Sequence, residues 1–384
     1  MPGEEGETKT LYAVWQQGQA ITFTYDSNVT KIDILDTSGA TVGTITSSDQ
    51  SLVLAQGDTY TIKPTHTTGY TTNTITKTSG AGTLNGKQFT VGAGAATLSV
   101  TSRTLTTFDQ AYAAAGKTKY NNYYKIQDMT TEICSAVDSQ ELGVVGQVID
   151  SRDNEVYYVA KLADCKCWML DNLRLDLGNS TVLNNTTESN TNASTTTLNY
   201  LKNGGGSTSD RYPTAKINNV PWTSSSQNYY SIPMTISTYK DQTTTSYGEG
   251  SGKIGVYYNY CAASAGNYCF GNGTSFGSPS GDATEDICPK GWRMPTGGSS
   301  GEYRAHYTAY SSDATSFRNA LSTPLSGSFY SGSASSQGTY GEFWSSTYLN
   351  ANNMYYLRVN SSYVAPSNSS NRNPGNSVRC LQGS

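Results

Sequence analysis

Side chains able to perform covalent chemistry are few in this sequence, and they do not form a recognisable catalytic set. Residues 297–301 read GGSSG and match the GxSxG pattern of a serine nucleophile elbow, but they lie in a Gly/Ser-rich stretch with no buried strand before it. The only candidate base nearby is His306. Residues 250–255 match GxGxxG but precede a predicted strand, whereas a dinucleotide-binding loop follows a strand and opens a helix. We therefore expect no enzymatic activity and no cofactor.

Cysteine is the other residue type with chemical potential, and the chain has seven cysteines. None forms a CxxC pair, and the only histidines, His66 and His306, lie far from the cysteines in sequence, which disfavours a zinc site. Disulfides are the better interpretation, and they indicate an extracellular protein. An odd count leaves one thiol unpaired. The cysteines are Cys134, Cys165, Cys167, Cys261, Cys269, Cys288 and Cys380.

Composition excludes several classes of partner. Charged residues make up only 14% of the chain and the net charge is −4, so there is no basic surface for nucleic acid. No stretch approaches the roughly 18 apolar residues of a membrane span, so we expect no membrane insertion. The start, MPGEEGETKT, lacks the features of an export signal, and we interpret the signal and any anchor as absent from this chain.

The first hundred residues read as short strands. Residues 1–17 end in TLYAVWQ, which resembles the last strand of a Listeria-Bacteroides repeat, a small β-grasp module. Residues 18–103 contain alternating apolar segments separated by turn-forming residues, which predicts an immunoglobulin-like β-sandwich that serves as a spacer.

Residues 104–384 have a different sequence pattern. Helical periodicity over 105–116 and 313–321 alternates there with strands such as GVYYNY at 255–260, so this domain is expected to be α+β.

Four ordered motifs in the last domain carry a resemblance to a known family. They are DSRDNEVYYVAKLADCKCWMLDNLRL at 150–175, ICPKGWRMPT at 287–296, FWSSTY at 343–348 and NSVRCL at 376–381. Together they closely resemble the Fibrobacter succinogenes major paralogous domain family. The resemblance implies a C-type-lectin-like fold on a bacterial surface, similar to the variable proteins of diversity-generating retroelements, and no enzymatic activity. The predicted fold class is therefore α+β, with a C-type-lectin-like domain preceded by an all-β immunoglobulin-like sandwich.

The resemblance also suggests how the cysteines pair. Cys288 and Cys380 stand in two of the shared motifs, and a bond between them would contribute about 4 kcal/mol in the loop-entropy model. Cys134 with Cys167 is the second expected pair, and Cys261 with Cys269 is a local third. Cys165 stands where family members have Gly, and it is the expected free thiol. Trp168, Trp292 and Trp344 lie in the motifs and are expected in the core.

The segment from 348 to 376 is the predicted ligand-binding face. Sparse apolar residues alternate there with Tyr, Asn and Ser, the residue types from which antibody combining sites are built. Its density of Asn also suggests a retroelement-diversified region. We expect an adhesin or other binding protein at the cell surface with a protein or glycan ligand. The alternative is a structural surface-layer protein without a dedicated ligand. The predicted site residues are Tyr348, Asn350, Asn352, Asn353, Tyr355, Arg358, Asn360, Tyr363, Ser367, Asn368, Ser370, Asn371, Asn373 and Asn376.

Overall fold

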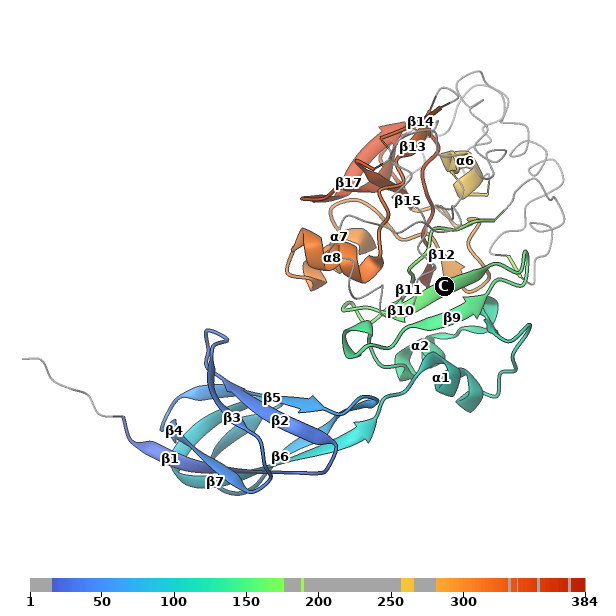
Figure 1. Ribbon diagram of the computed structural model, residues 1–384. Helices are drawn as coiled ribbons and strands as arrows, with labels where there is room; N and C mark the ends of the chain where they lie inside the picture. The colour runs from blue at the N-terminus through green and yellow to red at the C-terminus, as the bar shows by residue number, and fades with distance from the viewer. Residues whose placement is uncertain are drawn as a thin grey trace, which may run out of the picture. The chain divides into compact units, whose positions relative to one another are not determined.

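Strands dominate the structure shown in Figure 1. The computed structural model describes residues 16–175, 188–189, 257–265, 281–330, 333–336, 338–350, 353–371 and 374–383. These residues are 46% strand and 14% helix, and the sheets are curled and barrel-like. The predicted fold class, α+β with a C-type-lectin-like domain after an immunoglobulin-like sandwich, is therefore wrong. The chain divides into two compact units, with the boundary in sequence between Leu105 and Thr106.

The first unit is a single seven-stranded sheet. Its strands are β1 (Gly18–Tyr25), β2 (Val29–Leu35), β3 (Thr41–Ile45), β4 (Gln50–Ala55), β5 (Thr59–His66), β6 (Tyr70–Asn85) and β7 (Gln88–Thr104). The strand order is β3-β2-β5-β7-β1-β4, with β6 also paired to β7. An immunoglobulin-like sandwich would instead have two separate antiparallel sheets.

Strand β7 explains why one sheet forms. Its first residues pair antiparallel with β5, and residues 96–100 pair in parallel with β1. Its other edge pairs with β6 along most of its length. One long strand therefore joins the strand groups into a continuous curled sheet. The inward-facing side chains form one apolar core that includes Phe23, Ile32 and Leu98, all fully buried.

The second unit contains a six-stranded sheet with the order β12-β18-β11-β10-β9-β8. Its strands are β8 (Tyr124–Lys125), β9 (Gly146–Ile149), β10 (Val156–Lys161), β11 (Cys167–Met169), β12 (Trp292–Arg293) and β18 (Leu381–Gln382). The central strands β10 and β11 come from the 150–175 motif. The later motifs supply β18 and β12, which form one edge of the sheet. Trp168, Trp292 and Trp344 are fully buried, which confirms their expected place in the core.

The helices of the second unit are short. They are α1 (Phe108–Ala114), α2 (Thr131–Ala136), α6 (Tyr260–Ala263), α7 (Glu302–Ala309) and α8 (Ala314–Leu321), with 3-10 turns at Ile126–Asp128 and Gln140–Leu142. Side chains of Thr107 and Asp313 cap the starts of α1 and α8, as such residues commonly do. The predicted strand at 255–260 is not formed in its described part, because Tyr258 makes only an isolated bridge and α6 begins at Tyr260.

Two further small sheets complete this unit. The antiparallel strands β13 (Ser328–Tyr330) and β14 (Ser333–Ser335) form one. The strands β15 (Gly341–Tyr348), β16 (Asn353–Val359) and β17 (Val364–Asn371) form the other, an antiparallel sheet with β16 in the middle. Helix α7 packs against β17. A core cluster that includes Phe343 and Leu357 joins this sheet to α7, α8 and the six-stranded sheet.

A buried arginine ties the end of the chain to the middle of this unit. The Arg379 side chain is fully buried, and its guanidinium donates to the carbonyls of Leu321 and Ser322 at the end of α8. It also donates to the side-chain oxygen of Asn172 at 2.9 Å. Carbonyls at a helix C-terminus lack helical partners and attract a cation, so the guanidinium satisfies them.

Two disulfides hold the same region, and both are pairs expected from the sequence. Cys134 is bonded to Cys167, and Cys288 is bonded to Cys380, each with a Cα–Cα distance of 5.9 Å. The second bond joins the residue before β18 to the segment before β12. The expected Cys261–Cys269 pair falls outside what the structure describes. Cys165 is a free, exposed thiol in the turn before β11.

Within the described residues, helices long and apolar enough to cross a membrane are not found.

Replacement of Arg379 by Met should destabilise the second unit. The substitution leaves the buried carbonyls of Leu321 and Ser322 without their donor, so the free energy of unfolding should fall by about 3–5 kcal/mol. Arg304 on α7 is exposed, and Arg304→Met should change it by no more than about 0.5 kcal/mol. Chemical denaturation measures both, and equal stability of the two variants would contradict the assigned role.

Alkylation of the native, unreduced protein should label Cys165 alone among the five cysteines whose bonding the structure describes. Peptide mapping should recover Cys134 with Cys167 and Cys288 with Cys380. Label on any of these four before reduction would overturn the pairing.

Candidate ligand-binding face

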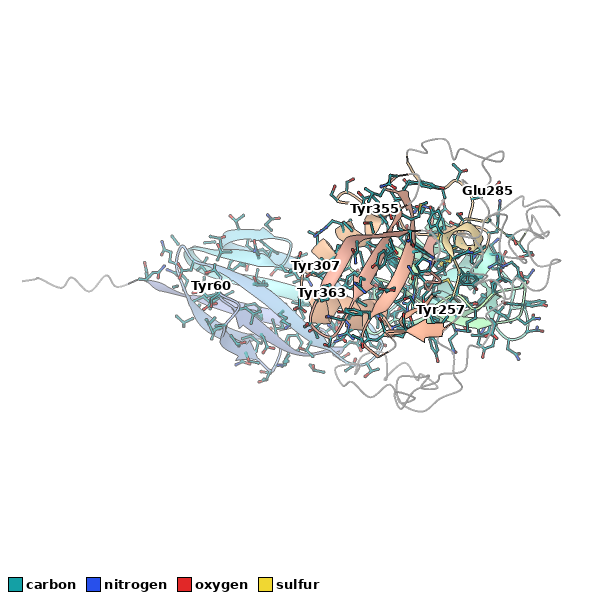
Figure 2. All side chains as sticks on the ribbon, turned by 90° about the horizontal axis from the view of Figure 1, so that it is seen from above. Tyr60, Tyr257, Glu285, Tyr307, Tyr355 and Tyr363 are labelled. Carbon is teal, nitrogen blue, oxygen red and sulfur yellow. A yellow bond between two sulfur atoms is a disulfide. The ribbon has the colours of Figure 1, made fainter. Side chains whose placement is uncertain are left out.

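The predicted binding segment forms β16 and β17 of the three-stranded sheet, and Tyr355 and Tyr363 are labelled on it in Figure 2. Residues paired across antiparallel strands point to the same face. Glu342 pairs with Arg358, and Trp344 pairs with Tyr356, which pairs in turn with Asn368. These five side chains therefore share one face of the sheet.

The exposure of the predicted site residues varies widely. Asn350, Tyr363 and Asn371 are exposed, whereas Tyr348 and Asn376 are buried. Asn352 and Asn373 fall outside the described residues. The remaining predicted residues, which are Asn353, Tyr355, Arg358, Asn360, Ser367, Asn368 and Ser370, are half-buried.

Two of the predicted asparagines organise turns. The side-chain oxygen of Asn360 accepts the backbone N–H groups of Ser362 and Tyr363, both at 2.8 Å. The side-chain oxygen of Asn350 accepts the N–H of Asn353 at 3.0 Å. These oxygens already have partners within the protein, which is the usual role of Asn in turns. We therefore assign both residues to shaping the face.

One end of the face carries an arginine–tyrosine cluster, which we define as Tyr340, Glu342, Arg358 and Tyr363. The Arg358 guanidinium lies 4.1 Å from the centre of the Tyr340 ring, and Nε of Arg358 lies 3.0 Å from Oε1 of Glu342. The Tyr340 and Tyr363 rings meet edge to face at 6.4 Å. The Arg358 side chain keeps 30% of its surface exposed and Tyr363 keeps 37%. The cluster is thus held by internal contacts and remains accessible.

Next to the cluster, Tyr356 and Asn368 form a polar pair. Nδ2 of Asn368 donates to the Tyr356 hydroxyl at 2.9 Å. Burial raises the pKa of Tyr356 to about 12, so the phenol is neutral at physiological pH and retains its proton. Behind it, Trp344, Tyr260 and Tyr348 pack edge to face, with ring centres 5.5 Å apart for Tyr260 with each of the other two. This aromatic packing fixes the sheet from which the cluster projects.

The opposite face of the sheet packs on the loop before α7. A Cβ atom at Gly297 would lie 2.6 Å from Cβ of Tyr355, so only glycine fits there. Gly298 accepts a hydrogen bond from the Ser367 hydroxyl at 2.7 Å. The GGSSG sequence that resembles a nucleophile elbow is therefore a close-packed support for β16 and β17.

Glu302 anchors this loop. Its carboxylate receives both terminal nitrogens of Arg293, at 2.6 and 2.7 Å, and Nζ of Lys166 at 2.6 Å. The backbone N–H of Thr296 also donates to it. Burial acts to raise the pKa of Glu302, but these hydrogen bonds outweigh burial and lower the pKa from 4.5 to about 2.

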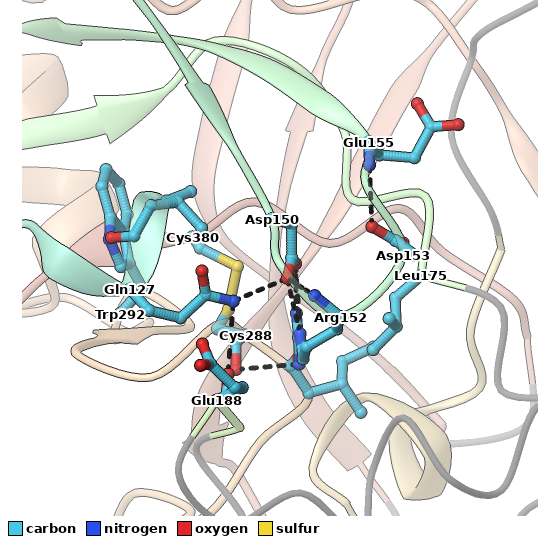
Figure 3. Close-up of polar contacts among 12 residues, drawn as sticks. Gln127, Asp150, Arg152, Asp153, Glu155, Leu175, Glu188, Cys288, Trp292 and Cys380 are labelled. Atoms are coloured by element: carbon cyan, nitrogen blue, oxygen red, sulfur yellow. Dashed lines mark hydrogen bonds and ion pairs between the residues drawn. A yellow bond between two sulfur atoms is a disulfide. The ribbon is translucent and has the colours of Figure 1, made fainter. Parts of the chain in front are cut away.

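The 150–175 motif builds a second buried polar network, shown in Figure 3. Asp150 and Arg152 have fully buried side chains joined at 2.7 Å, and Arg152 also donates to the carbonyl of Ile287 at 3.0 Å. Nε2 of Gln127 donates to Asp150 at 2.6 Å. Burial and then the charge of Asp150 raise the pKa of Asp153 to about 6. The network connects the β9–β10 turn to the segment that carries Cys288, so the motif has a structural role.

Sequence reasoning missed three residues of the face: Tyr340, Glu342 and Tyr356. The first two precede the predicted segment, and only the β15–β16 register brings Glu342 beside Arg358. Over the described parts of the chain, no three His, Cys, Asp or Glu side chains are grouped so that they could hold a metal ion.

The fold and site define a disulfide-bonded, β-rich protein with a partly exposed Tyr/Arg/Asn face. No protein-family model, curated protein or solved structure matches the chain. The geometry and the four sequence motifs are therefore the basis for a functional proposal.

Replacement of Glu302 by Gln tests the support beneath the face. Because the folded pKa of Glu302 is depressed, its contribution to stability is present above about pH 4.5 and is lost as the pH falls toward about 2. Glu302→Gln should therefore lower the free energy of unfolding by about 2–3 kcal/mol at neutral pH. The gap between wild type and variant should narrow in acid. Denaturation at several pH values checks this, with the exposed Glu141→Gln as control, and a gap independent of pH would refute the assignment.

Proposed function

We propose that this protein is an extracellular binding protein whose ligand contacts the arginine–tyrosine cluster and the adjoining strands β16 and β17. The observation that carries the proposal is the cluster itself. Both Arg358 and Tyr363 are partly exposed, yet Arg358 is held by Tyr340 and Glu342, and Tyr363 packs on Tyr340. Tyr and Arg dominate the energetics of protein-binding surfaces, and side chains ordered in advance lose less entropy on binding.

The alternation of buried and displayed residues supports this assignment. On β16, Tyr356, Leu357 and Val359 are buried, while Arg358 is half-buried. On β17, Val364 is buried, while Asn368 is half-buried. Residues that fold the sheet are therefore largely distinct from residues that a ligand would meet.

Compartment and family are parts of the same proposal. Two disulfides are compatible with an extracellular protein, and we propose display at a cell surface. The four ordered motifs support membership of the Fibrobacter succinogenes major paralogous domain family. Retroelement-driven variation of residues 348–376 would suit the division between folding and displayed residues. A near-identical repeat beside a reverse-transcriptase gene in the flanking DNA is the observation that would support it.

The binding face is tested by replacing Tyr363, the exposed tyrosine of the arginine–tyrosine cluster, with Ala. The Tyr363→Ala variant should keep the wild-type unfolding free energy within about 0.5 kcal/mol, because the side chain is exposed. Its affinity should fall by about tenfold or more for a ligand found on glycan and cell-surface-protein arrays. Tyr120→Ala is the matched control, since Tyr120 is 38% exposed and lies outside the face.

Undiminished binding by the Tyr363→Ala variant would refute the assignment of the face. If the wild-type protein binds no member of either array, the structural surface-layer role becomes the better account.

A further inference from the structure

The second unit contains a cavity of about 360 Å³ that is formed by none of the residues of the proposed binding face. Three segments line it: residues 107–109 at the start of α1, Lys119 with Asn122 and Tyr123 before β8, and residues 145–147 where β9 begins. Its volume lies near the lower end of the range of roughly 300–1,000 Å³ for small-molecule pockets. A ligand in it would therefore be small.

Part of the wall is apolar. Phe108 is only 2% exposed, and Tyr123 and Val145 are half-buried. A Cβ atom at Gly146 would lie 2.6 Å from the Phe108 ring, so the ring packs directly on the backbone of β9. The Phe108 ring is thus fixed by the fold.

The rest of the wall is polar and neutral overall. Nζ of Lys119 lies 2.6 Å from the Asp109 carboxylate, so the two charges compensate each other. The hydrogen bond to Asp109 raises the pKa of Lys119, which keeps the ammonium charged. Asn122 and Gln147 each add an amide that can both donate and accept hydrogen bonds, and both side chains are exposed.

The segment that carries Asn122 is shaped before any ligand binds. Asn121 and Asn122 have φ values of 47° and 70°, and Tyr120 and Tyr123 exchange backbone hydrogen bonds of 2.7 and 3.1 Å across them. Two central residues with positive φ between paired strands are characteristic of a type I′ turn. The turn places Asn122 and Tyr123 at the wall of the cavity.

We propose that this cavity binds one or two residues of a neutral saccharide. A sugar ring has a C–H face that packs on aromatic and apolar side chains, and adjacent hydroxyls that both donate and accept hydrogen bonds. Tyr123 and Val145 supply the first kind of surface, and Asn122, Gln147 and the Asp109–Lys119 pair supply the second. A ligand with net charge would find no uncompensated charge on this wall. The inference is independent of the proposed binding face.

The test removes the two amides without disturbing the turn. In the double variant Asn122→Gly with Gln147→Ala, glycine keeps the positive φ at 122, and both deleted side chains are exposed. Asn121→Gly is the matched control, because it makes the same change in the same turn at a residue outside the cavity lining. The full chain is titrated by NMR with glucose, galactose, mannose, N-acetylglucosamine and their disaccharides, and with glucuronate as the anionic comparison.

At least one neutral saccharide should bind with a Kd on the order of 1 mM, and resonances of residues 107–109 and 119–123 should shift. The double variant should bind about tenfold more weakly, while Asn121→Gly should bind as the wild type does. Saturable binding by no neutral sugar, unchanged binding by the double variant, or tighter binding of glucuronate would each overturn the proposal. If the double variant melts at a lower temperature, Gln147→Ala alone decides, since its side chain is exposed on β9.

Discussion

The buried guanidinium of Arg379 is the interaction on which the second unit depends most. It lies one residue before the Cys288–Cys380 disulfide and binds the carbonyls that end α8 together with Asn172 of the 150–175 motif. Three segments far apart in sequence therefore meet at one side chain. Asn172 extends the contact to Ser377, whose hydroxyl lies 3.0 Å from that of Ser326. Because a guanidinium buried this deeply must have its donors satisfied, these hydrogen bonds strongly favour the observed arrangement of the three segments.

The binding face is a product of that arrangement. Strand β15 begins shortly after the segment that Arg379 and Ser377 fix, and the carbonyl of Ser377 accepts the N–H of Trp344 at 3.0 Å. The Trp344 ring in turn packs edge to face on the Tyr356 ring of the neighbouring strand. On the other face, Glu302 holds the loop on which Tyr355 packs. The exposed tyrosine and arginine side chains are consequently displayed by a sheet whose two faces are both supported.

Part of this structure could be predicted from sequence because local patterns determine it. Alternating apolar residues identified β1 to β5, and helical periodicity identified α1 and α8. Strand β6 was missed because its Thr, Ser, Gly and Asn residues show no apolar alternation, and it is stabilised by hydrogen bonds to β7. The same limit applies to the fold class. A series of short strands is compatible with two sheets or with one, and the parallel pairing of β1 with β7 is a contact that no local pattern specifies.

The candidate site shows the same division. Residue types indicated a Tyr/Asn/Ser surface near 348–376, but burial of Tyr348 depends on Tyr260, which lies far away in sequence. Glu342 joins the cluster through strand register alone. Composition can therefore indicate what kind of side chain is displayed, whereas tertiary contacts decide which ones are accessible.

The turn between β16 and β17 has a consequence for how such a surface can change over time. Asn360 satisfies the backbone N–H groups of Ser362 and Tyr363 from within the turn, so the loop geometry does not rely on the side chains at 361–363. Those three positions are exposed. Exchange of their side chains would alter the chemistry offered to a partner while the backbone path stays the same. New specificities could thus arise by single substitutions without a prior gain in folding stability to compensate for them.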